Sequence, residues 1–265
     1  MIIEKYFGID QKIVQQLIDA TKNMNHEKTG DNGFQNTKVF LFDEYAVLKQ
    51  DNMNARNVTT EDKDLRHLER LSGTLLDLQN QGVNVVPILA FQSDDGNGYI
   101  IQPRAKGAEM YDRDKVRSLD KEYILERVKF LSDVPQEHFD KFIADTIRII
   151  DAGVLIDCWG KDNFFYDETI GFQFIDLNAH LDYEYGLSDE KAQGKEIIQF
   201  FCFLPCYFGT APELTDEENI LFKTNNKKIF EKCKAAMINN GITEEKINEI
   251  ISSEKFISQK QQLEL

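Results

Sequence analysis

The sequence predicts an α+β fold with two lobes, a small one built on an antiparallel β-sheet and a larger one that is mostly helical. Two pairs of short β-rich runs, each joined by a tight turn, occur in the chain up to residue 104. Apolar residues at helical spacing dominate the chain after it. A length of 265 residues is enough for two modest cores. We therefore predict a small lobe over 1–104 and a large helical lobe over 105–265.

The composition excludes some classes of partner. The formal net charge is −15, from 31 basic and 46 acidic residues. Nucleic acids and anionic membranes are bound through clusters of Lys and Arg, so we expect neither as a partner. No apolar run approaches twenty residues, so we predict no membrane span. The four cysteines lack paired zinc-ligand spacing, and the first residues do not read as a signal peptide, which makes a cytoplasmic location the expectation.

The small lobe reads as a helix followed by a sheet. Asp10 is a suitable N-cap for an amphipathic helix over 10–22. A polar stretch with Gly30 and Gly33 comes next, and these glycines would let backbone amides approach phosphates, although a plain loop fits the same residues. The remaining elements of the lobe are a possible weak strand before Thr37, strands over 37–42 and 45–49, a helix over 60–79, and strands over 85–91 and 99–102.

The large lobe reads as helices around one β-hairpin. A helix over 135–150 stops at an Asp-Ala-Gly sequence and leads into an apolar strand over 154–156. Thr215 and Glu218 have the spacing of a capping box. The other expected elements are hairpin strands over 164–166 and 171–175, a buried helix over 190–204, and a helix that stops at 240–241 before another starts at 243.

Polar residues stand at the ends of the three apolar strands of this region. Asp157 follows the first strand, Asn163 opens the second, and Asp176 closes the third. A hairpin of this kind directs two carboxylates and one amide toward one place. Mg2+ prefers such oxygen ligands together with phosphate oxygens. The pattern therefore predicts a magnesium site beside a carboxylate that can accept a proton.

This segment resembles the catalytic and metal-binding loops of the protein-kinase-like superfamily, including its bacterial aminoglycoside and choline kinase branch. The resemblance identifies Asn163 and Asp176 as Mg2+ ligands, and the two are thirteen residues apart, about as in the family. It assigns Asp157 the role of catalytic base.

The small lobe extends the resemblance. The sequence Ala-Val-Leu-Lys that ends at Lys49 resembles the strand whose lysine pairs with nucleotide phosphates. Alternation places Val47 on the same face as Lys49, where it would cover the nucleotide base. Glu69 lies twenty residues after Lys49, close to the family spacing for the ion-pair partner of this lysine.

The resemblance also implies ATP as the cofactor. It places the hinge at 102–107, where backbone groups near Gln102 and Arg104 would bind the adenine edge. It further implies that Phe165 and Ile175 are cofactor-binding positions. The expected reaction is transfer of the γ-phosphate of ATP, with Mg2+, to a hydroxyl of a small molecule or protein, and nothing in the sequence identifies this acceptor.

The chain departs from the family pattern at the catalytic loop. The family places its base five residues before the asparagine, and Cys158 occupies this position, one residue after Asp157. Either the loop carries one extra residue or the base is displaced. The second case predicts a nucleotide-binding pseudokinase, and a third reading keeps the fold but transfers another group, such as AMP.

Overall fold

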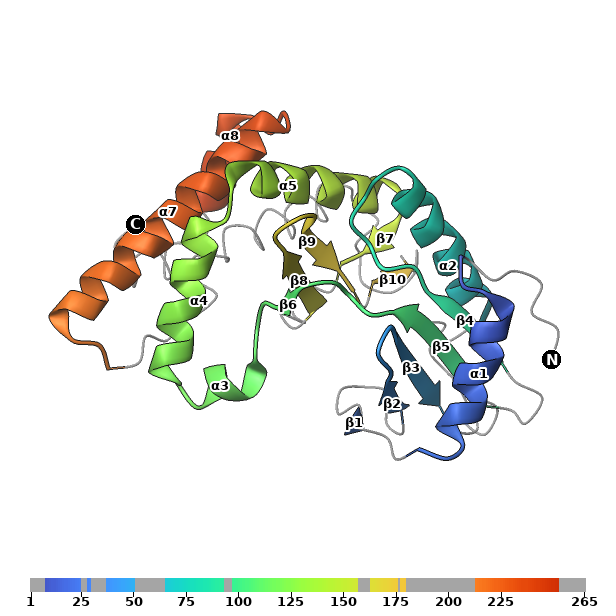
Figure 1. The fold of residues 1–265 in the computed structure, drawn as a ribbon. Coiled ribbons are helices and arrows are strands. Elements are labelled where there is room, and N and C mark those ends of the chain that lie inside the picture. Colours follow the sequence, from blue (N-terminus) through green and yellow to red (C-terminus); the bar gives the residue numbers. More distant parts are fainter. Residues whose placement is uncertain are drawn as a thin grey trace. The chain divides into compact units, whose positions relative to one another are not determined.

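The computed structural model describes residues 8–24, 28–29, 37–50, 65–92, 97–156, 163–175, 177–179 and 213–252. The chain forms two compact units. Unit 1 comprises Met1–Lys106, Ala152–Leu155 and Leu177–Leu181, and unit 2 comprises Gly107–Asp151, Ile156–Asp176 and Asp182–Leu265. Unit 1 holds an antiparallel sheet, whereas unit 2 is mostly helical (Figure 1). The predicted α+β class with a small sheet lobe and a helical lobe is confirmed.

The sheet of unit 1 has five strands in the order β1-β2-β3-β5-β4, each antiparallel to its neighbours. The strands predicted before residue 85 are confirmed, including the weak first one. The strand predicted over 85–91 begins later than expected, at Leu89, because Pro87 has no N–H for a ladder bond. The strands are β1 (Lys28–Thr29), β2 (Thr37–Leu41), β3 (Tyr45–Gln50), β4 (Leu89–Gln92) and β5 (Gly98–Pro103).

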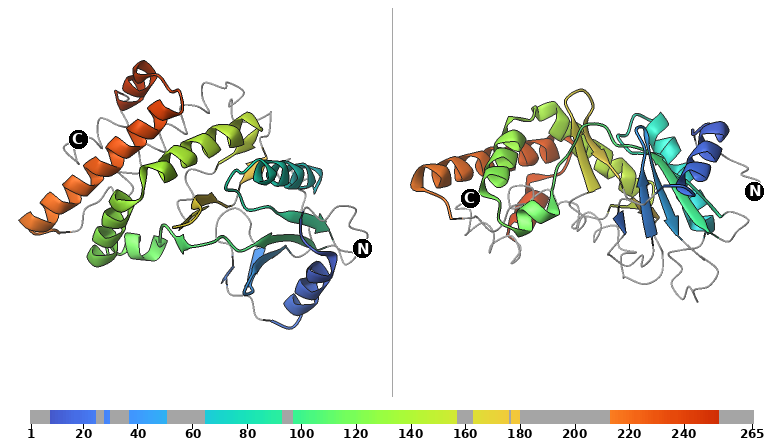
Figure 2. Two further views of the ribbon diagram at one scale, coloured as in Figure 1. Left: turned by 45° about the horizontal axis from the view of Figure 1, so that its top comes forward. Right: turned by 60° about the horizontal axis from the view of Figure 1, so that its bottom comes forward.

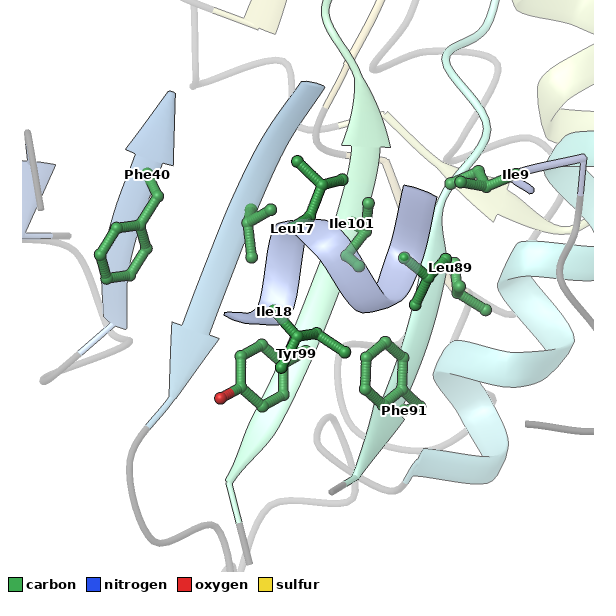
Figure 3. Close-up of a cluster of buried hydrophobic side chains, with 10 residues drawn as sticks. Ile9, Leu17, Ile18, Phe40, Leu89, Phe91, Tyr99 and Ile101 are labelled. Atoms are coloured by element: carbon green, nitrogen blue, oxygen red, sulfur yellow. The ribbon is translucent and has the colours of Figure 1, made fainter. Parts of the chain in front are cut away.

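Helix α1 (Gln11–Thr21) covers one face of this sheet (Figure 3). It begins as predicted, because the Asp10 carboxylate accepts a hydrogen bond of 2.7 Å from the Lys12 N–H. Its apolar stripe packs on side chains that alternate along β2, β3, β5 and β4. The cluster contains Ile9, Val14, Leu17, Ile18, Phe40, Val47, Leu89, Phe91, Tyr99 and Ile101.

Helix α2 (Leu65–Asn80) and a two-stranded ladder complete the described part of unit 1. The helix confirms the one predicted over 60–79, with Leu71, Leu75 and Leu78 buried. It contacts β4 and also β10 (Asn178–Ala179). Strand β10 pairs antiparallel with β7 (Val154–Leu155), so that Leu155 stands opposite Asn178.

Helices form most of unit 2. Helix α7 runs along α4 and α5 (Figures 1 and 2). It begins with the predicted capping box, in which Thr215 and Glu218 bond to each other's backbone N–H groups. The predicted helix over 190–204 lies outside the described residues. The helices are α3 (Arg113–Arg117), α4 (Lys121–Asp133), α5 (Gln136–Asp151), α7 (Asp216–Asn239) and α8 (Glu244–Ile251).

A three-stranded sheet packs on α5 through aromatic side chains. Its strands are β6 (Ala108–Glu109), β8 (Phe164–Asp167) and β9 (Gly171–Phe174), in the order β6-β8-β9. The hairpin of β8 and β9 confirms the one predicted from the sequence. Phe142 on α5 has its ring within 5.7 Å of the rings of three hairpin residues, Phe164, Phe172 and Phe174. These buried rings form one core of unit 2.

None of the described helices combines the length and the apolar character needed to cross a bilayer.

Candidate functional site

Several predicted site residues lie outside the described part of the chain. These are Gly30 and Gly33 of the polar loop, and Asp157, Cys158 and Asp176 of the catalytic region. Glu69 is described only by its position on α2. Their predicted roles therefore stay predictions.

Described residues that precede or follow Asp157 and Asp176 in the sequence form backbone pairings with one another. In unit 2 the Ile175 N–H donates a hydrogen bond of 3.0 Å to the Asn163 carbonyl. In unit 1 the β7–β10 ladder pairs Leu155 with Asn178. Asp176 directly follows Ile175, and Asp157 comes two residues after Leu155. Each predicted carboxylate is thus at most two residues from a described backbone pairing.

The hairpin presents three predicted site residues on one face. Phe164 and Phe174 form a cross-strand pair that faces α5. Side chains alternate along a strand, so Phe165 belongs to the opposite face. Continuing the register places Asn163 opposite Ile175 on that same face, in agreement with their backbone hydrogen bond.

All three of these side chains are half-buried, whereas the rings facing α5 are buried. The predicted metal ligand Asn163 and the predicted cofactor-binding residues Phe165 and Ile175 therefore share the hairpin face away from the core. The Asn163 backbone carbonyl accepts the hydrogen bond from the Ile175 N–H. The part of Asn163 that can act as a donor or acceptor toward a ligand is therefore its side-chain amide.

The structure places Val47 and Lys49 on the sheet face that α1 covers. Val47 is 0% exposed and packs in the α1 cluster. It therefore has no surface to offer a nucleotide base, and we do not include it in the proposed site. Lys49 is half-buried, and its Nζ lies 6.0 Å from the centroid of the Tyr99 ring. Its direct neighbour on β2 is Lys38.

Some backbone groups of the predicted hinge form hydrogen bonds with β3 and with the residue before it. The Arg104 N–H donates a hydrogen bond of 2.8 Å to the Glu44 carbonyl. Hydrogen-bonded pairs alternate along an antiparallel ladder, so the pair of Gln102 with Ala46 is also a hydrogen-bonded one. The backbone groups of these two predicted hinge residues thus bond to the β3 side of the ladder, and the Arg104 N–H is not available to an adenine.

The same alternation directs the Pro103 carbonyl away from β3. Continuing the β4–β5 register places Pro87 opposite Pro103. Neither proline has an N–H, so the ladder supplies no donor to the Pro103 carbonyl. This acceptor was not among the site residues predicted from the sequence. Its signal was a strand that ends on a proline, Pro103, together with a second proline, Pro87, two residues before the neighbouring strand β4.

Comparisons with known proteins give only a distant similarity. No protein-family model and no curated protein matches the chain. Among solved structures, a complex of WbdD with a kinase inhibitor matches 90% of this chain and 50% of its own, at 10% identity and a TM-score of 0.42. A structure of the bifunctional kinase-methyltransferase WbdD matches 88% of this chain and 50% of its own, at 12% identity and a TM-score of 0.41. The chain spans about half the length of these structures. A similarity this low supports no statement about activity, so we build the proposal on this chain's own residues.

Proposed function

We propose that the chain is an ATP- and Mg2+-dependent phosphotransferase that moves the γ-phosphate of ATP to a hydroxyl of an acceptor. One observation supports it above the others: Asn163, Phe165 and Ile175 share the half-buried face of the β8–β9 hairpin, opposite the face that packs on α5. Along the sequence, the hairpin lies between Asp157 and Asp176.

The proposed metal site has suitable donors. Asn163 offers an amide oxygen and Asp176 a carboxylate, and both are the hard oxygen ligands that Mg2+ takes in proteins. When bound, Mg2+ neutralises phosphate charge. In this proposal Asp157 orients the acceptor hydroxyl and accepts its proton, while Lys49 binds phosphate oxygens and Glu69 positions Lys49.

The proposed adenine contact differs from the one that the sequence suggested. The Pro103 carbonyl accepts no ladder bond, so we propose it as the acceptor for the adenine amino group. This replaces the Arg104 N–H, which is bonded to Glu44.

A second candidate is nucleotide binding without turnover. The position five residues before Asn163 holds Cys158, and a thiol with a pKa of about 8.5 is a weak base at neutral pH. Both candidates require MgATP binding and differ only in whether phosphate is transferred.

The test is incubation of the chain with Mg2+ and ATP labelled at either the α- or the γ-phosphate. Labelled acceptor or released phosphate from γ-labelled ATP alone supports phosphotransfer. Label transferred from the α-phosphate identifies AMP transfer instead, and binding without any transfer identifies the second candidate. Lys49→Ala should abolish most γ-transfer, whereas Lys38→Ala removes the same charge one strand away and should retain it.

A further inference from the structure

Arg127 on α4 lies between two aromatic rings of its own helix. The carbon of its guanidinium group is 5.4 Å from the centroid of the Tyr123 ring and 5.8 Å from that of Phe130. Its Nε is buried and has no hydrogen-bond partner. A buried N–H without an acceptor is uncommon, and such a group can be satisfied by a water molecule, an ion or a ligand.

Arg127 also differs from other cations of its helix, because it has no carboxylate partner among the described residues. On the same helix, Lys121 pairs with Glu218 and Lys129 pairs with Asp133, each at 2.9 Å. Within the described part of the chain, Arg127 forms no such pair. Its charge is half-buried, where interactions with an anion are stronger than in water.

A second cation approaches the same ring from α3. The Lys115 Nζ lies 5.1 Å from the centroid of Tyr123, and Lys115 makes no ion pair with any described residue. The Tyr123 ring is held in place, because it is 7% exposed and its hydroxyl accepts a hydrogen bond of 2.7 Å from the Asp112 N–H.

Two carboxylates lie in these surroundings. Asp112 is the N-cap of α3, and its carboxylate accepts hydrogen bonds from the N–H groups of Asp114 and Lys115. Glu109 is exposed and acts on Tyr123 electrostatically. Neither forms an ion pair with Arg127.

We propose that Arg127 and Lys115, on either side of the link between α3 and α4, form a binding site for the oxyanion group of a small ligand, a phosphate or a carboxylate. The guanidinium presents parallel N–H donors that match both groups, and the aromatic rings hold it in one orientation. The ammonium group of Lys115 adds a second, mobile charge. The site lies within unit 2, uses none of the residues of the proposed phosphotransfer and does not depend on that activity.

The probes are inorganic phosphate, methyl phosphate and acetate, each titrated at constant ionic strength into the full chain. Binding is followed by calorimetry and by the 15N–1H signal of the Arg127 Nε, which is assigned by its loss in Arg127→Lys. We expect saturable binding of at least one probe and a shift of this signal. Preference for the phosphates or for acetate assigns the group that the site takes.

Four variants distinguish a specific binding site from a general effect of charge. Arg127→Gln should weaken binding about tenfold or more, because it removes charge-assisted hydrogen bonds. Lys115→Gln should weaken it by a smaller factor, and Lys129→Gln, which removes one charge from the same helix, should not change it. Arg127→Lys keeps the positive charge but lacks the parallel N–H donors of the guanidinium, and it should bind with intermediate affinity. This variant also provides the test if Arg127→Gln does not fold. Absence of saturable binding, or equal losses in Arg127→Gln and Lys129→Gln, would overturn the proposal.

Discussion

The proposed chemistry depends on side-chain oxygen atoms of Asp157, Asn163 and Asp176. Of these three residues, Asn163 is the one that the structure describes. Its backbone carbonyl is bonded to Ile175, and its half-buried side chain shares a face with Phe165. Asp157 is the residue on which turnover depends in the proposal. Asp157 lies one residue before the position that the family resemblance predicts for the base. A substitution of Asp157 therefore tests whether this residue is the base.

Asp157→Asn should reduce turnover by about 10²–10⁴, because the amide cannot accept the proton of the acceptor hydroxyl. Binding of MgATP should stay nearly unchanged, since Asp157 meets the acceptor and not the nucleotide. Single-turnover rates and a nucleotide titration measure the two effects. Cys158→Ser is the matched control and should leave the rate close to that of the wild type. If Cys158→Ser is impaired and Asp157→Asn is not, the base lies at the other position.

At the scale of elements, glycines and caps hold the described parts together. Gly107 stands just before β6, with φ at +83°, and a Cβ at this position would overlap the backbone carbonyl of Tyr166 on β8. The close approach of β6 to β8 therefore requires a glycine. Gly82, at the end of α2, has nearly the same φ of +81°, but apart from its chain neighbours no described atom lies within 4 Å of where a Cβ would stand.

This pair of glycines gives a stability prediction. Gly82→Ala should cost about 1–2 kcal/mol of unfolding free energy, from the positive φ alone. Gly107→Ala carries the same cost plus the overlap with Tyr166, for which we expect a further ~1–3 kcal/mol. Urea denaturation of both variants measures the difference. Equal midpoints for the two would show that β6 can move away from β8 freely.

The capping box of α7 gives a pH-dependent prediction. A hydrogen bond from Lys121 and one from the Thr215 N–H lower the pKa of Glu218 below its ordinary value. A lowered pKa means that the carboxylate stabilises the fold at neutral pH, and that this stabilisation is lost as the pH falls through the folded-state pKa.

Glu218→Gln should therefore unfold at a lower urea concentration than the wild type at pH 7, and this difference should disappear at pH values below the Glu218 pKa. Glutamine can still reach the Thr215 N–H, so the comparison isolates the charge. Glu217→Gln changes the same charge in the same turn and should have the smaller effect at pH 7. A difference that persists unchanged into acid would remove the carboxylate as its cause.

At the scale of the whole molecule, nucleotide binding should appear as added stability. A ligand that binds only the folded state stabilises it by about 2.7 kcal/mol at a concentration of a hundred times its Kd. ATP phosphates and the Asp176 carboxylate repel each other unless Mg2+ lies between them. MgATP should therefore raise the Tm of the wild type and much less that of Asp176→Ala.

Asp151→Ala is a suitable control, because Asp151 is an exposed carboxylate at the end of α5. Its Tm should rise with MgATP as in the wild type. The same increase in Asp176→Ala would exclude Asp176 as the metal ligand, and the same loss in both variants would point to a general effect of charge.

The amino-acid sequence by itself determined several of the elements and the start of two helices. Alternation predicted the hairpin of β8 and β9, helical spacing predicted α1, α2 and α5, and side-chain chemistry predicted the Asp10 cap and the capping box of Thr215 with Glu218. These features depend on residues a few positions apart, whose interactions the local sequence contains.

Only the tertiary structure decided which face of each element packs on what. Periodicity showed that Val47 shares a face with Lys49, but the burial of this face under α1 depends on residues more than twenty positions away. The pairing of β3 with β5 likewise decided that the Arg104 N–H bonds to Glu44 while the Pro103 carbonyl points away from β3. Register and packing between distant segments are collective properties of the folded chain, and a local pattern does not specify them.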